Sequence, residues 1–120
     1  MYMDRLDLEL YKGSDNTITV DIKNDDRSDV SFQGELIAVV KRTYAGCEMA
    51  RFTVSFDDVD DKITLFMPAE ETMKLDFVRK TAPYDMFVYD LLYIHEDAVD
   101  LVCYGKVKVQ AGVTYEKDRL

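Results

Sequence analysis

Residues 84–114 contain two long stretches of alternating side chains, and this pattern constrains the fold more than any other. In the first stretch, residues 86–94, one face carries Phe87, Tyr89, Leu91 and Tyr93. A period of two is typical of a β-strand with one buried face. After the short polar segment 95–98 the alternation resumes, with one face made of Leu101, Cys103, Gly105, Val107 and Val109. Because the connection is short, the pattern predicts a long hairpin whose apolar faces belong to one core.

Five further strands are predicted before this hairpin, over residues 5–11, 17–23, 36–42, 49–56 and 63–67. In the first of them, Leu6, Leu8 and Leu10 alternate with acidic residues and are expected to face inward. The polar turn 12–16 is short, so the first two strands are predicted to pair as a hairpin. Residues 36–42 are apolar on both faces. This is typical of a central strand covered on both sides, or of a strand whose outer face meets a partner.

Residues 68–75 form the one stretch that predicts a helix. Pro68 suits the first helical position, the two glutamates after it suit the positive end of the helix dipole, and Lys74 suits the negative end. About seven strands with one short helix predict an all-β fold. We expect an antiparallel, two-sheet β-sandwich that forms a single domain over residues 1–120.

The charge balance excludes some classes of partner. The chain has 24 acidic and 15 basic residues and a formal net charge of −9. This field repels nucleic-acid phosphates, so we expect no nucleic-acid partner. No apolar run approaches the roughly 18 residues of a membrane span, and we expect no membrane partner. The start of the chain lacks the pattern of a signal peptide, so Cys47 and Cys103 are expected to be separate thiols in a reducing cytoplasm.

Few residues offer chemistry. Asp57, Asp58, Asp60 and Asp61 are possible oxygen ligands for Ca²⁺, but they lack the spacing of an EF-hand loop, so a solvated hairpin tip is the simpler interpretation. His95, the single histidine, has no histidine or cysteine near it in the sequence for a zinc site or a nucleophile pair. We therefore expect no enzyme and no cofactor, and we assign no catalytic, cofactor-binding or metal-binding residue.

Asp90 and the tyrosines leave alternatives open. Asp90 interrupts the apolar strand 86–94, where its carboxylate either faces solvent or accepts hydrogen bonds, because a buried charge must be paired. Six tyrosines fall at strand ends or on second faces: Tyr2, Tyr11, Tyr44, Tyr84, Tyr104 and Tyr115. They suit either the rim of a sandwich or a protein interface.

Short motifs in a consistent order run along about 100 residues of the chain. They are Leu-x-Leu-x-Leu-Tyr-x-Gly-Ser-Asp at 6–15, Thr-Ile-Thr-Val at 17–20, Phe-Gln-Gly at 32–34, Ile-Thr-Leu-x-Met-Pro-Ala-Glu-Glu-Thr at 63–72, Tyr-Asp-Leu at 89–91, Gly-Lys-Val-x-Val at 105–109 and Val-Thr at 113–114. In this order they resemble small phage virion proteins whose domain is similar to the N-terminal domain of baseplate upper proteins.

The resemblance implies an immunoglobulin-like sandwich that serves assembly rather than catalysis. It implies a bacteriophage structural protein of the head, neck, tail or baseplate, located in a virion that is assembled in the host cytoplasm. Its partners would be other phage structural proteins or further copies of the chain. It assigns a role to no individual residue. Two alternatives remain open: an acidic inhibitor that imitates DNA toward a host nucleic-acid enzyme, and a sandwich that binds Ca²⁺ or carbohydrate.

Overall fold

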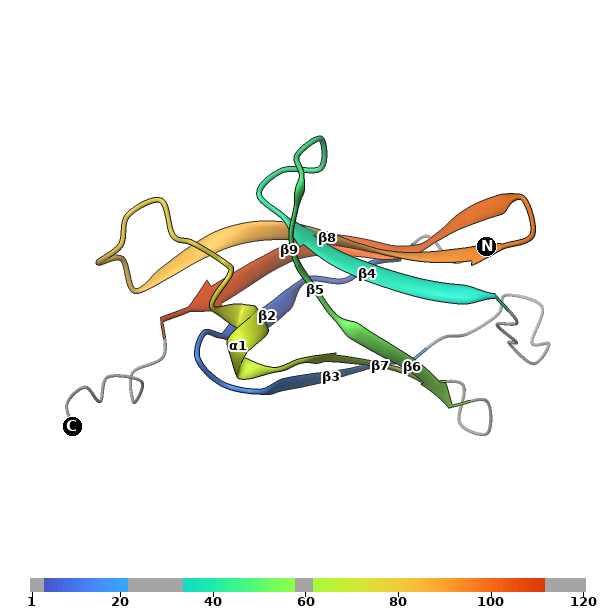
Figure 1. The fold of residues 1–120 in the computed structure, drawn as a ribbon, viewed down its shortest axis with the longest axis horizontal. Coiled ribbons are helices and arrows are strands. Elements are labelled where there is room, and N and C mark those ends of the chain that lie inside the picture. Colours follow the sequence, from blue (N-terminus) through green and yellow to red (C-terminus); the bar gives the residue numbers. More distant parts are fainter. Residues whose placement is uncertain (1–3, 22–33, 58–61, 112–120) are drawn as a thin grey trace.

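A computed structural model describes residues 4–21, 34–57 and 62–111, and these form two β-sheets stacked face to face (Figure 1). The larger sheet has the order β1-β9-β8-β4-β5, with β2 also beside β9. Its strands are β1 (Asp4–Arg5), β2 (Leu8–Tyr11), β4 (Glu35–Lys41), β5 (Glu48–Arg51), β8 (Tyr84–His95) and β9 (Ala98–Gln110). The smaller sheet has the order β3-β7-β6. Its strands are β3 (Asn16–Asp21), β6 (Thr53–Asp57) and β7 (Lys62–Met67). The predicted two-sheet β-sandwich is confirmed.

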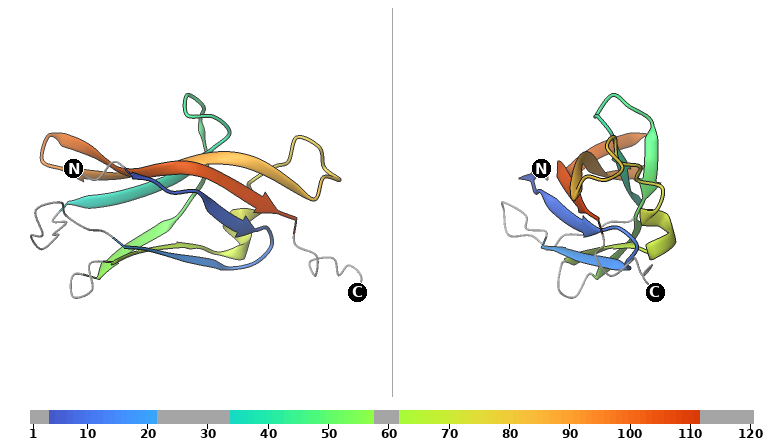
Figure 2. Two further views of the ribbon diagram at one scale, coloured as in Figure 1. Left: turned by 180° about the vertical axis from the view of Figure 1, so that it is seen from behind. Right: turned by 90° about the vertical axis from the view of Figure 1, so that its left-hand side faces the viewer.

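The core lies between the two sheets, which Figure 2 shows from behind and end-on. Its largest fully buried side chains come from both layers and include Leu10, Ile63, Leu65, Met67, Phe87, Tyr89, Leu91, Val107 and Val109. Those from residues 63–67 and 86–94 lie on the inward faces that the period of two predicts for these two strands. Burying large apolar side chains contributes about 1.5 to 3 kcal/mol each, so this layer dominates the stability of the fold.

The β8–β9 hairpin forms as predicted, with Glu96 in a left-handed conformation (φ 50°) at its tip. Its register shifts between Leu91 and Leu92, where Val102 is an extra residue on β9. A bulge of this kind reverses the faces of the residues beyond it. Val102 is therefore fully buried, and Leu101 lies opposite Leu92 on the outer side of the sheet. The predicted inward position of Leu101 is wrong for this reason.

The predicted hairpin of the first two strands is also wrong. β2 runs parallel to β9 in the larger sheet, whereas β3 runs antiparallel to β7 in the smaller one. The turn between them carries the chain from one layer to the other. The Asn16 side chain supports this turn, because its amide accepts from the Tyr11 N–H and donates to the Tyr11 carbonyl, both at 3.0 Å. A side chain thus takes the place of the backbone partner that a hairpin would supply.

The predicted strand 5–11 is interrupted at Leu6 and Asp7, so β1 and β2 follow each other along the same edge of β9. At the interruption the Asp7 carboxylate accepts the Lys106 N–H at 2.9 Å, in place of a backbone carbonyl. Leu8 and Leu10 are buried as predicted, but Leu6 is 37% exposed. Its side chain lies where the chain leaves the strand geometry. Because both pieces are parallel to β9, the fold is not wholly antiparallel.

Residues 49–56 form two strands rather than one. β5 belongs to the larger sheet and β6 to the smaller, and the chain changes layer at Phe52. The Phe52 side chain is buried in the core, and its N–H donates to the Ala38 carbonyl at 2.9 Å. An aromatic anchor at the crossing therefore explains why a single apolar alternation spans two sheets.

The helix α1 (Ala69–Thr72) is a single turn, shorter than the predicted 68–75, with Pro68 as its N-cap. Buried Thr72 ties this turn to the β2–β3 connection. Its hydroxyl accepts the Gly13 N–H at 2.8 Å and donates to the Ala69 carbonyl at 2.6 Å. Within the described ranges, no helix has the length and apolar character needed to cross a membrane.

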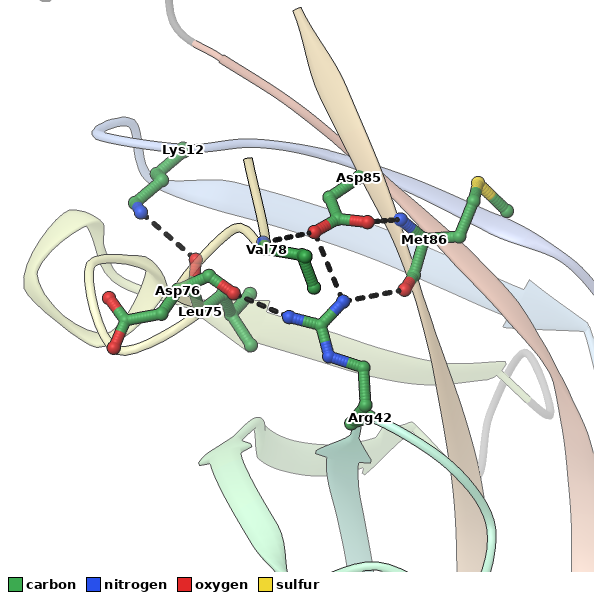
Figure 3. A network of polar contacts seen from close by, with 7 residues as sticks. All are labelled: Lys12, Arg42, Leu75, Asp76, Val78, Asp85 and Met86. Atoms are coloured by element: carbon green, nitrogen blue, oxygen red, sulfur yellow. Dashed lines mark hydrogen bonds and ion pairs between the residues drawn. The ribbon is translucent and has the colours of Figure 1, made fainter. Parts of the chain in front are cut away.

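Arg42 holds the connector that follows α1 against the larger sheet (Figure 3). One guanidinium nitrogen donates to Asp85 at 3.1 Å and to the Met86 carbonyl at 3.3 Å, and the other donates to the Asp76 carbonyl at 2.5 Å. The group also lies over the Phe87 ring, 4.2 Å from its centroid. One side chain therefore joins three segments of the chain.

Asp85 is the acceptor at the centre of this network (Figure 3). Partial burial opposes its ionisation. However, the N–H groups of Val78 and Met86, each at 2.8 Å, and the guanidinium of Arg42 together hold its pKa below the usual value. Asp85 is therefore a structural carboxylate that is ionised at neutral pH.

Candidate protein interface

The side of the larger sheet that faces away from the smaller sheet is the candidate site, and we call it the outer face. Its central row crosses five strands. Side chains that are neighbours across β1, β9, β8, β4 and β5 form this row: Arg5, Tyr104, Asp90, Val39 and Arg51. The described elements make only two layers, so the outer face is not covered by a third sheet (Figures 1 and 2).

Apolar side chains surround Asp90 on the outer face. The neighbouring row contains Leu101, Leu92 and Ile37, and the next one contains Val99 and Ile94. On the other side of Asp90 lies Val88. Most of these side chains are partly buried, and Val99 is 59% exposed. Strand β4 is thus apolar on both faces, as the sequence indicates, with Ala38 and Val40 in the core and Ile37 and Val39 on the outer face.

A hollow of about 290 Å³ lies in the outer face and is lined by Tyr44, Asp90, Leu101 and Tyr104. Tyr44 comes from the β4–β5 connection and folds back over β9. Its hydroxyl donates to the Gly105 carbonyl at 3.0 Å, and its ring meets Tyr104 edge-on, with the centroids 6.3 Å apart. Partial burial raises the pKa of Tyr44. This contact sets the position of one wall of the hollow.

The Asp90 side chain lies on the outer face and is partly exposed, so the solvent-facing one of its two predicted situations applies to the side chain as a whole. Its Oδ1 is buried, yet it has no hydrogen-bond partner among the described residues. A carboxylate oxygen without a donor is an unsatisfied acceptor, which native structures seldom retain without a reason. The outer face therefore holds an acceptor beside an apolar hollow.

Charged residues border the apolar part of the outer face. Lys41 and Lys106 flank Val88 in the row next to Asp90, and neither side chain forms an ion pair with a described residue. At the two ends of the central row, Arg5 pairs with Asp7 at 3.2 Å and Arg51 pairs with Glu48 at 2.9 Å.

These charges balance on the outer face. The Lys106 N–H first, and then Arg5, lower the pKa of Asp7, which keeps this carboxylate ionised. The pairing of the strands places five basic residues on the outer face, Arg5, Lys41, Arg51, Lys106 and Lys108, and four acidic ones, Glu9, Glu35, Glu48 and Asp90. Asp7 lies at the edge of this face, paired with Arg5, and with it these charges sum to zero, although the chain as a whole carries −9.

The other residues considered from the sequence do not join this site. His95 ends β8, stacks on Tyr93 with centroids 4.5 Å apart, and contacts Asp100 at 3.2 Å across the hairpin. Cys47 is exposed and Cys103 is buried 3.6 Å from the Tyr89 hydroxyl, so the two cysteines are separate thiols as predicted.

The acidic cluster falls largely beyond the described residues. Asp57 ends β6, which pairs with β7 as the predicted connection requires, whereas Asp58, Asp60 and Asp61 lie outside the described ranges. Across residues 4–21, 34–57 and 62–111, no three histidine, cysteine or acidic side chains gather closely enough to hold a metal ion.

The tyrosines divide between edges and the hollow. Tyr11 and Tyr84 are about half exposed at strand ends, while Tyr44 and Tyr104 line the hollow. Tyr2 and Tyr115 lie outside the described residues. The sequence indicated Asp90 and Tyr104 separately. It did not predict that Leu101 joins them, because that depends on the bulge at Val102.

Comparisons with known proteins add a similarity in shape. No family model and no curated protein matches the sequence. Among solved structures, the chain is similar to the crystal structure of Listeria monocytogenes InlP, with 15% sequence identity and a TM-score of 0.48. The match covers 91% of this chain and 26% of InlP, so the chain spans about a quarter of the length of that protein.

Proposed function

We propose that this chain is a non-enzymatic structural protein of a bacteriophage particle, in its head, neck, tail or baseplate, that acts through contacts with neighbouring proteins. The ordered motifs that resemble phage virion proteins supply the context. The apolar outer face around Asp90 is the observation that carries the proposal. It offers the kind of surface that an assembly protein needs.

The outer face differs from the expected surface of an antiparallel sandwich. Such a sheet usually has one face on the core and a polar face in water. Here Ile37, Leu92, Ile94 and Leu101 adjoin one another on the side opposite the core. A contiguous apolar patch with a polar rim is typical of a protein interface, and tyrosines at its centre support this interpretation.

Purified phage particles test this proposal. In cells infected by a phage that encodes the chain, quantitative mass spectrometry should find it in purified particles at a constant copy number per particle. The double variant Leu92→Asp, Ile37→Asp should fold but lose incorporation, because it places charges within the apolar patch.

A matched control separates this effect from a general effect of added charge. The double variant Thr17→Asp, Thr19→Asp adds the same charge at exposed positions of β3 in the smaller sheet. It should be incorporated like the wild type. A wild-type chain abundant in infected cells but absent from purified particles would contradict the proposal.

A further inference from the structure

We propose that the outer face binds the outer face of a second copy of this chain, and that the hollow at Asp90 receives the ammonium group of Lys41 or Lys106 from that copy. The inference rests on the proposed assembly function. It identifies one partner, a second copy of the chain, and the lysine–Asp90 contact that would fix how the two copies are aligned.

The hollow has the chemistry of a site for a cationic side chain. The Asp90 carboxylate lines the hollow, and no described residue donates to its buried Oδ1. The rings of Tyr44 and Tyr104 lie beside it, and Leu101 adds an apolar wall. A lysine that enters would place its ammonium group on the carboxylate and near the aromatic rings, while its methylene stem would cover Leu101. Each part of a lysine side chain thus has a matching surface.

The same outer face supplies the cation. Lys41 and Lys106 lie in the row next to Asp90, on the strands that flank β8, and their side chains form no ion pair with a described residue. In a two-fold symmetric dimer, a residue that contacts a second residue of the partner is itself matched by the reverse contact. If the two-fold axis of the dimer passes between the row of Asp90 and the row of Lys41 and Lys106, each Asp90 lies opposite a lysine of the other copy. Two equivalent ion pairs then form.

The local charge balance of the outer face makes it the face best suited to binding a second copy. Two molecules of charge −9 repel each other. On the outer face, however, the acidic and basic residues balance, and apolar side chains occupy the centre. Two outer faces can therefore approach without a net local repulsion, with complementary charges around an apolar patch.

The available area agrees with a weak but specific dimer. Strands lie about 4.8 Å apart, and outward residues repeat about every 6.6 Å along a strand, so each outward position covers roughly 32 Å². About 20 such positions on the outer face make roughly 600 Å² per copy, at the lower end of specific interfaces.

Sedimentation velocity of the purified chain tests the inference. From about 1 to about 500 µM, the range expected for a small interface, the wild type should pass from monomer to dimer. Asp90→Lys should raise the dissociation constant by about tenfold or more, because like charges then face each other. The double variant Lys41→Asp, Lys106→Asp should do the same from the opposite side.

An equimolar mixture of these two variants is the decisive sample. The lysine introduced by Asp90→Lys then meets the carboxylates introduced by Lys41→Asp and Lys106→Asp in the other chain. The intact Lys41 and Lys106 of the first variant meet the intact Asp90 of the second, so a heterodimer should form at wild-type affinity. Glu70→Lys and Lys80→Asp change exposed charges elsewhere and should dimerise like the wild type. Circular dichroism and thermal unfolding verify that each variant is folded.

Three outcomes would overturn the inference: a wild type that stays monomeric throughout, an Asp90→Lys variant that dimerises like Glu70→Lys, or a mixture of folded variants that stays monomeric. A monomeric wild type would leave the proposed assembly function open to the particle experiment, with a different protein as partner. A chain that dimerises but is absent from particles would contradict only the assembly function.

Discussion

Gly105 should tolerate a side chain poorly, because the Leu6–Asp7 segment that follows β1 approaches the backbone of β9 closely at this point. A Cβ added to Gly105 would lie 2.3 Å from the Leu6 carbonyl oxygen and 2.8 Å from an oxygen of Asp7. Carbon and oxygen do not approach so closely without a bond. Gly105→Ala must therefore push the Leu6–Asp7 segment away from β9.

The displaced segment makes several hydrogen bonds. The Leu6 N–H donates to the Tyr104 carbonyl at 2.8 Å, the Leu6 carbonyl accepts from buried Tyr89 at 2.6 Å, and Asp7 accepts the Lys106 N–H at 2.9 Å. Each contributes about 1 kcal/mol, and a buried group left unsatisfied costs about 1 to 3 kcal/mol. Replacing glycine by alanine also lowers the conformational entropy of the unfolded chain, which offsets up to about 1 kcal/mol of this loss of stability. We expect the free energy of unfolding to fall by about 2 to 4 kcal/mol.

Urea unfolding followed by circular dichroism measures this loss, and the melting temperature should fall by about 4 °C per kcal/mol. Gly46→Ala is the control, because its Cβ would meet Thr43 at 3.2 Å, a contact that small shifts relieve. It should cost less than about 1 kcal/mol. Tyr89→Phe should reproduce about 1 to 2 kcal/mol of the Gly105→Ala loss, since it removes the donor to the Leu6 carbonyl together with the weaker contact to the Cys103 sulfur. If the free energy of unfolding of Gly105→Ala lies within about 0.5 kcal/mol of the wild-type value, the close approach of the Leu6–Asp7 segment to β9 is refuted.

Three further predictions concern other regions. The pKa of Asp85 lies below its usual 3.8, so its ionised form stabilises the fold above that pH and the contribution disappears as the pH falls through the lowered value. Urea titrations from pH 6 to about 2 should therefore show a smaller acid-induced loss for Asp85→Asn, and equal losses would count against the network. Thr72→Val should lower the free energy of unfolding by about 1 to 3 kcal/mol and Thr72→Ser by much less, since only valine leaves the Gly13 N–H without its acceptor. Calcium should leave the melting temperature unchanged, and a rise that Asp58→Ala abolishes would reveal a site at the acidic cluster.

The sequence predicts the faces of the strands better than their partners. Alternation identified the inward side of β7 and β8, because burial selects apolar residues at every second position. The choice of sheet depends on contacts between distant segments. Asn16 and Phe52 stand where the chain changes layer, and neither residue type signals such a crossing by itself. The predicted first hairpin and the predicted strand 49–56 are wrong for this reason.

The candidate interface was predictable only in part. Asp90 stood out in the sequence as an acidic residue within an apolar strand. Strand β4 is apolar on both faces, which indicated that its outer face could contact a partner. The hollow itself requires the register of five strands and the return of Tyr44 over β9. A one-residue bulge at Val102 then moves Leu101 to the outer face. Neither a register nor a bulge can be read from one sequence, because both depend on pairing between strands.

The chain passes between the two sheets at residues 12–15, at Phe52 and through α1, and these connections link the two layers covalently (Figure 1). Neither layer is a continuous piece of chain, so neither can detach and survive as an independent fragment. Separating the strands of one sheet pulls on the segments that connect it to the other sheet. We therefore expect the domain to unfold in a single cooperative transition.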